Sequence, residues 1–160
     1  NKIIGFFAKP VTLADGSLDM MRWECGIPGK AGTAWENGLY KLTLTFSDQY
    51  PAHPPKCTVC LFVLDINLLK PQNTLGVFID PLPHPNIFPS GAVCLSIIGH
   101  DWKPSITLKQ ILLGIQDLLS NPNLKSPANG HYHDMLRNDK AMWERVVRKF
   151  AAKHAVTFID

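Results

Sequence analysis

Residues 39–46 read Leu-Tyr-Lys-Leu-Thr-Leu-Thr-Phe, with apolar side chains at positions 40, 42, 44 and 46 and polar ones at 41, 43 and 45. This period of two predicts a half-buried β-strand, because successive side chains of a strand point to opposite faces. The same alternation precedes this stretch at Met21, Trp23, Cys25 and Ile27. The first half of the chain is therefore expected to form antiparallel strands.

Three short turn signals accompany these strands: Asp15-Gly16, Pro28-Gly29 and Asn37-Gly38. Each is short enough to join neighbouring strands, which predicts a β-meander. A cluster of prolines at 51, 54 and 55 follows and should end the sheet, since proline has no N–H to donate to a strand ladder.

The second half of the chain changes to helical periodicity. Thr107 and Gln110 match a capping box, and the residues after Thr107 form one apolar stripe: Leu108, Ile111, Leu112, Ile115, Leu118 and Leu119. A further helix is predicted from about Asp139 to His154, with an inward face of Met142, Trp143, Val146, Val147 and Phe150. Strands followed by helices, without βαβ alternation, predict an α+β domain with an antiparallel sheet.

Length and composition predict one globular domain over residues 1–160, with 46% hydrophobic and 18% charged residues. A net charge of +3 argues against nucleic acid as the main ligand and is compatible with an acidic protein partner. The longest apolar run, 59–69, is interrupted by Asp65 and Asn67, so no membrane span is expected. The chain begins with Asn1 and not Met, so we expect its true start to lie upstream.

The four cysteines are unevenly spaced in a chain too long to need disulfide bridges, which favours reduced thiols. Cys57 and Cys60 form a C-x-x-C, but no second pair stands at the spacing of a structural zinc site. We interpret both as strand cysteines. A metal pair at His131 and His133 lacks companion ligands, and a surface or helix-start position is favoured for them.

The segment 84–94, His-Pro-Asn-Ile-Phe-Pro-Ser-Gly-Ala-Val-Cys, is the least generic stretch of the chain. Its prolines and glycine prevent regular structure, and rigid loops of this kind often hold functional sites. Cys94 is a candidate nucleophile, with the Asn86 amide as a donor to an oxyanion; the alternative is a buried strand cysteine. His84 is either a general base or a hydrogen-bonded anchor of the loop.

These residues resemble a known signature. His84-Pro85-Asn86 followed by Cys94-Leu95, Trp102 and Pro104 is similar to the active-site motif of ubiquitin and ubiquitin-like conjugating enzymes. Further stretches resemble the SUMO-conjugating members of that family: Trp23-Glu24-Cys25, Ile27-Pro28-Gly29-Lys30, Trp35-Glu36, Pro54-Pro55-Lys56-Cys57, Pro89-Ser90-Gly91, Cys94-Leu95-Ser96-Ile97 and Lys109-Gln110-Ile111-Leu112.

The resemblance implies the family fold, with an N-terminal helix, a four-stranded antiparallel meander, an active-site loop and then helices. It also implies an ATP-dependent pathway in which Cys94 takes SUMO from an activating enzyme as a thioester and passes it to a substrate lysine. Asn86 would stabilise the oxyanion or brace the loop, and His84 would hold the turn. No metal or cofactor is implied.

The resemblance assigns further residues and partners. Ser126 and the Phe88 ring would shape the approach of the lysine, and Lys56, Ser90 and Ala92 would line the surface that binds the substrate motif. Expected partners are SUMO, its activating enzyme, SUMO ligases and substrate proteins, with neither a membrane nor direct nucleic-acid binding. The expected location is the nucleus and cytoplasm.

Several positions depart from the SUMO-type pattern. Phe88 replaces a tyrosine, Ser126 an aspartate and Ala92 a threonine, and the loop before Trp102 is shorter. The short loop and Ser126 favour a ubiquitin-conjugating enzyme as the alternative, and a non-catalytic binding module with the same fold is a second one. The resemblance begins near Gly5, so the sequence is expected to lack the N-terminal helix.

An atypical insert forms the largest departure. Twenty-six residues lie between Cys57 and His84, considerably more than the family has there, and those at about 60–80 are strongly apolar. Surface loops that tolerate insertions are usually polar. We interpret the segment as translated intron or a gene-model error, with a genuine insertion such as a hairpin as the alternative.

Overall fold

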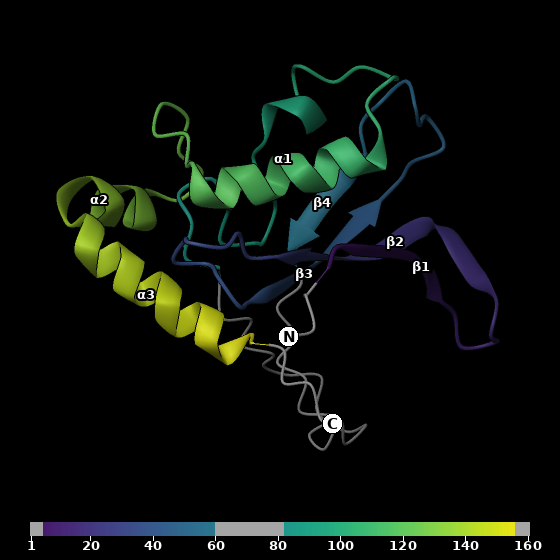
Figure 1. The fold of residues 1–160 in the computed structure, drawn as a ribbon. Coiled ribbons are helices and arrows are strands. Elements are labelled where there is room, and N and C mark those ends of the chain that lie inside the picture. Colours follow the sequence, from purple (N-terminus) through teal and green to yellow (C-terminus); the bar gives the residue numbers. More distant parts are fainter. Residues whose placement is uncertain (1–4, 60–81, 156–160) are drawn as a thin grey trace, which may run out of the picture.

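The computed structural model describes residues 5–59 and 82–155. Its sheet contains β1 (Phe7–Thr12), β2 (Leu18–Pro28), β3 (Leu39–Thr45) and β4 (Lys56–Val59). The strands lie in sequence order and each pairs antiparallel with the next. The predicted four-stranded meander is therefore confirmed (Figure 1). The prediction that the prolines at 51, 54 and 55 end the sheet was wrong, because β4 follows them and pairs with β3.

Helices follow the sheet in sequence, as predicted for an α+β fold. A 3₁₀ turn, η2 (Ser96–Ile98), precedes α1 (Leu108–Ser120), α2 (Gly130–Asn138) and α3 (Lys140–Lys153). In Figure 1, α1 runs across the sheet and α3 lies beyond it, next to α2. None of the helices in the described ranges is long and apolar enough to cross a membrane.

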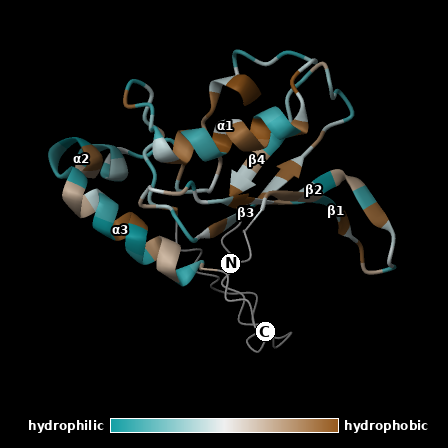
Figure 2. Cartoon of the chain, viewed as in Figure 1, coloured by the Kyte–Doolittle hydropathy of each residue, from teal (hydrophilic) through white to brown (hydrophobic). Residues whose placement is uncertain are grey.

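The strand alternation produces the core. Tyr40, Leu42 and Leu44 of β3 are almost completely buried, as the period of two predicts. Leu42 pairs with Cys25 of β2 on one side and Val59 of β4 on the other, so buried side chains align across three strands. The apolar sides of α1 and α3 join the same core, and both helices also carry hydrophilic residues (Figure 2).

The turn predictions were correct for one connection and wrong for another. Asp15-Gly16 lies in the short connection between β1 and β2. Pro28-Gly29 and Asn37-Gly38 are not separate strand-to-strand turns: they stand at the two ends of one loop between β2 and β3, where the Gly29 amide donates to the Gly38 carbonyl at 2.9 Å. This loop carries the Trp35 side chain into the core.

Both predicted helices are present, and the predicted capping box is confirmed. Thr107 and Gln110 form the capping box of α1, and Asp139 accepts from the Met142 amide at the start of α3. Met142 was wrongly placed on the inward face: its side chain is 40% exposed, one residue before the buried Trp143. Neighbouring helical positions differ by about 100° in direction, and α3 is rotated so that Trp143 points into the core while Met142 lies at the edge of the buried side, toward solvent.

The segment that contains His131 and His133 begins α2, so their helix-start position is confirmed. Asn129 caps that helix by accepting from the Tyr132 amide. Cys57 is a buried strand cysteine, as interpreted. Cys60 and the rest of the predicted insert, at about 60–80, lie outside the described residues.

Candidate active site

The candidate loop begins at His84, whose side chain is fully buried. Its Nδ1 accepts from the Asn86 amide at 3.0 Å, so the ring proton is on Nε2, which lies 2.8 Å from the Leu118 carbonyl and donates to it. Burial lowers the pKa of His84 to about 4, because the charged imidazolium is poorly solvated there. Both ring nitrogens are occupied and the ring is neutral near pH 7, which is the geometry of a loop anchor and not of a general base.

Asn86 connects this loop to the segment after α1. Its Nδ2 donates to the carbonyls of Asn123 at 2.8 Å and Ser126 at 3.0 Å, and its Oδ1 accepts from the Asn123 amide at 2.8 Å. The residue is 1% exposed. With both amide protons and the oxygen engaged, the Asn86 side chain braces the loop, one of the two roles expected for it.

Cys94 lies at the other end of the loop and is partly exposed. Its amide donates to the Asn86 carbonyl at 2.9 Å, so the candidate nucleophile is tied directly to the bracing residue. Ile87 and Val93 form a β-bridge just inside this pair. Cys94 is therefore held on a short closed hairpin, as a partly exposed residue.

The hairpin turns at 88–92, where the Phe88 amide donates to Ala92 and the Gly91 amide donates to Phe88. Gly91 has φ of 85°, a left-handed conformation that favours glycine. A Cβ there would also lie 2.7 Å from the Val59 carbonyl oxygen. This close approach lets the Val59 amide donate to Gly91 at 2.9 Å, which docks the hairpin on β4.

A groove of about 660 Å³ lies beside this hairpin. Lys56 and Ala92 both line it, together with residues of the connection between β3 and β4 and of η2. Among its lining residues, Lys56 and His53 are the side chains that can carry positive charge, and no carboxylate is present. The groove is therefore suited to an extended chain that carries an acidic side chain.

The other predicted site residues lie around the loop. Ser90 is exposed at the hairpin turn, where its Oγ accepts from the Ala92 amide at 3.4 Å, and it does not line the groove. Phe88 is 44% exposed on the same turn. Ser126 is exposed on the segment that Asn86 holds. Asn86 thus joins Cys94 and Ser126, while Lys56 and Ala92 belong to the neighbouring groove.

Sequence reasoning missed the groups that hold the loop from outside. Asn123 contributes its carbonyl and amide, and the amides of Ala128 and Asn129 both donate to the Pro85 carbonyl. These are main-chain groups, so no side-chain pattern in the sequence could have identified them.

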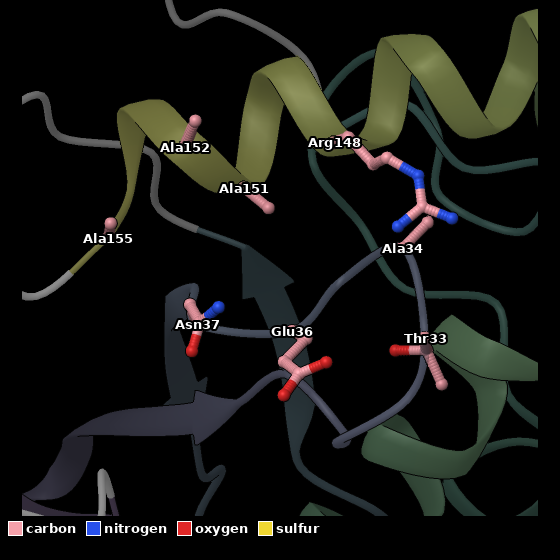
Figure 3. A pocket seen from close by; sticks show the side chains of 8 residues that line it. All are labelled: Thr33, Ala34, Glu36, Asn37, Arg148, Ala151, Ala152 and Ala155. Atoms are coloured by element: carbon pink, nitrogen blue, oxygen red, sulfur yellow. The ribbon is translucent and has the colours of Figure 1, made fainter. Parts of the chain in front are cut away.

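A second hollow, of about 400 Å³, lies between the β2–β3 loop and the C-terminal part of α3. Figure 3 shows Glu36 and Arg148 at this hollow, with Ala151, Ala152 and Ala155 on the helix side. None of the site residues predicted from the sequence lines this second hollow.

Comparison with known proteins identifies the family of the chain. A family model described as "Ubiquitin-conjugating enzyme" matches residues 4–151. The chain is 43% identical to SUMO-conjugating enzyme UBC9 of Caenorhabditis elegans, over 98% of this chain and 84% of that protein. It is 45% identical to Sumo-conjugating enzyme ubc9 of Dictyostelium discoideum, over 90% of this chain and 80% of that protein. The chain belongs to the ubiquitin-conjugating enzyme family.

Proposed function

We propose that this protein is a SUMO-conjugating enzyme that carries SUMO as a thioester on Cys94 and transfers it to lysines of substrate proteins. The observation that carries the proposal is the partly exposed residue Cys94 on a braced hairpin, in a chain similar to two SUMO-conjugating enzymes. The other two described cysteines, Cys25 and Cys57, are buried in the sheet.

Loading is a thioester exchange. The Cys94 thiol loses its proton, and its Sγ attacks the carbonyl carbon at the C-terminus of SUMO, which the activating enzyme presents as a thioester. A new C–S bond forms, the bond to the activating enzyme breaks, and the departing thiolate takes up a proton. A thiolate is intrinsically nucleophilic, so this exchange requires no metal.

Transfer is the more demanding step, because the lysine amine must be deprotonated before it attacks. The reference pKa of lysine is about 10.4, and desolvation of the amine lowers it. The exposed Phe88 ring supplies an apolar surface beside the loop, and Ser126 supplies a hydroxyl on the segment held by Asn86. The amine forms the isopeptide bond, the C–S bond breaks, and the Cys94 thiol is regenerated.

Asn86 acts in this proposal by bracing the active-site loop. Its side chain is committed to Asn123 and Ser126, while its carbonyl holds the Cys94 amide. Direct donation to the oxyanion would require one of those two amide hydrogen bonds to open. The geometry therefore supports bracing as its contribution to the ground state of the loop.

Substrate selection is assigned to the groove beside the hairpin. Lys56 and Ala92 both line this groove, and Lys56 would contact an acidic residue of the acceptor segment. Ser90 would contact the segment from the exposed turn. Further partners in this proposal are the SUMO-activating enzyme and SUMO ligases, and the protein would act in the nucleus and cytoplasm.

The test is thioester charging. The protein is incubated with ATP and the activating enzyme for SUMO or, separately, for ubiquitin, and adducts are examined on a non-reducing gel. We expect a reductant-sensitive SUMO adduct that is lost in Cys94→Ala and retained in Cys25→Ala. The Cys25 control is informative because burial, with a smaller contribution from Glu24, raises the pKa of that thiol to about 11.

Other outcomes would redirect the proposal. An adduct with ubiquitin alone would make the protein a ubiquitin-conjugating enzyme, as the Ser126 position suggests. The absence of any adduct from a folded sample would overturn catalysis and favour a binding module of the same fold.

A further inference from the structure

The start of the active-site loop has few backbone N–H donors. Pro83 and Pro85 carry no N–H, so the chain before Asn86 must be positioned mainly through its carbonyl groups. The Pro85 carbonyl accepts from the amides of Ala128 and Asn129. The Pro83 carbonyl has a different kind of partner, the side chain of Trp143.

Trp143 reaches this carbonyl from α3. Its indole Nε1 donates to the Pro83 oxygen at 3.0 Å, in a buried contact between residues 60 positions apart. The side chain is 5% exposed and packs edge-on against Trp35, with ring centroids 6.2 Å apart. Trp35 in turn lies 6.0 Å from the His84 ring.

We propose that Trp143 is a positioning residue for the Cys94 reaction, because its indole N–H holds the Pro83 carbonyl and thereby sets the start of the active-site loop. The inference rests on the proposed function and adds a residue to it. Trp143 does not contact the reacting atoms. It acts through the loop, whose next residues are held by Leu118, Ala128, Asn123 and Cys94.

The connection from Trp143 to the thiol is short along the chain. His84 follows Pro83 directly and accepts at Nδ1 from the Asn86 amide, and the Asn86 carbonyl accepts from the Cys94 amide. Loss of the indole donor would leave a buried carbonyl without its partner, which favours a shift of the loop toward water or another donor. Such a shift would move the Asn86–Cys94 pair.

Trp35 provides a matched control for this contact. It belongs to the same aromatic cluster, but its buried Nε1 has no hydrogen-bond partner among residues 5–59 and 82–155. Trp143→Phe and Trp35→Phe therefore remove the same atoms from neighbouring sites, and only the first removes a hydrogen bond. The two variants separate the indole donor from the general effect of a smaller ring in the core.

The experiment compares both variants in single-turnover discharge of the SUMO thioester to free lysine, well below their melting temperatures. We expect the maximal rate of Trp143→Phe to fall about two- to tenfold, the equivalent of one neutral hydrogen bond, with the lysine KM unchanged. Trp35→Phe should transfer at the wild-type rate. Equal slowing of the two variants, or wild-type transfer by Trp143→Phe, would overturn the inference.

Amide hydrogen exchange gives a readout that does not depend on SUMO. The peptide covering residues 82–95 should exchange faster in Trp143→Phe than in Trp35→Phe, and equal exchange would contradict the proposal. In the wild-type protein, hydrogen exchange at the Trp143 indole N–H and at the Cys94 amide should report the same opening free energy. This test needs no variant. If the wild type never forms a thioester, the proposed function fails while these exchange results still test the contact.

Discussion

The buried imidazole of His84 makes the stability of this protein depend on pH in a predictable direction. Burial lowers its pKa to about 4 in the folded chain, compared with about 6.5 for an exposed histidine. The unfolded chain therefore binds a proton between these values that the folded chain does not bind. The contribution of His84 to the free energy of unfolding is therefore fully present above about pH 6.5 and falls as the pH is lowered toward 4. Below about pH 4 the titration of His84 changes the stability no further.

The magnitude follows from the two pKa values. Each pH unit within the window changes the free energy of unfolding by up to about 1.4 kcal/mol for one proton. Between pH 7.5 and 5.0, His84 should lower the free energy of unfolding by about 2 kcal/mol. This is a large part of the total stability of a typical domain, about 5–15 kcal/mol.

The assay is urea unfolding, followed by circular dichroism at several pH values between 7.5 and 5.0, for the wild type and His84→Gln. The glutamine Nε2 can donate to the Leu118 carbonyl as His84 does, but it does not titrate. The wild type should lose about 2 kcal/mol more than His84→Gln over this range. Parallel pH profiles for the two proteins would refute the assignment of His84 as a buried, neutral anchor.

Three further perturbations test the loop and the helix that supports it. Gly16 and Gly91 both have positive φ, but of the two only Gly91 has a carbonyl oxygen close to the position of an added Cβ. Gly16→Ala should lower the free energy of unfolding by roughly 1–2 kcal/mol, and Gly91→Ala by clearly more. Equal losses in urea unfolding would contradict this expectation. Asn86→Asp keeps an acceptor for the Asn123 amide but loses both hydrogen-bond donors of the side chain. We expect the free energy of unfolding to fall by about 2–3 kcal/mol in denaturant titrations, and lysine discharge to become slower. An unchanged discharge rate would contradict the bracing role. Thr107→Ala removes the capping box of α1 and should lower stability by about 1 kcal/mol, measured as a shift in the urea midpoint; an unshifted midpoint would show that the cap contributes little.

Short-range patterns in the sequence predicted much of the fold. The alternation at 39–46 identified the central strand and its buried residues, because the direction of a strand side chain depends only on its position in the period. The capping box at Thr107 identified the start of α1, because that interaction spans only three residues. The helical period of the apolar residues identified α3. The candidate nucleophile and its neighbours were recognisable because His84, Asn86 and Cys94 lie within one short segment.

The partners of those residues depend on tertiary packing. His84 bonds to a carbonyl 34 positions away, Asn86 to groups 37 and 40 positions away, and Pro83 to an indole 60 positions away. No local period encodes such contacts, since they exist only once α1 and α3 are packed against the sheet. The same packing buries Trp143 and leaves Met142 exposed. It also joins the Pro28-Gly29 and Asn37-Gly38 segments as the two ends of a single loop between β2 and β3. The sequence therefore determines which groups are available for the chemistry, while the packed helices and sheet determine which of them meet.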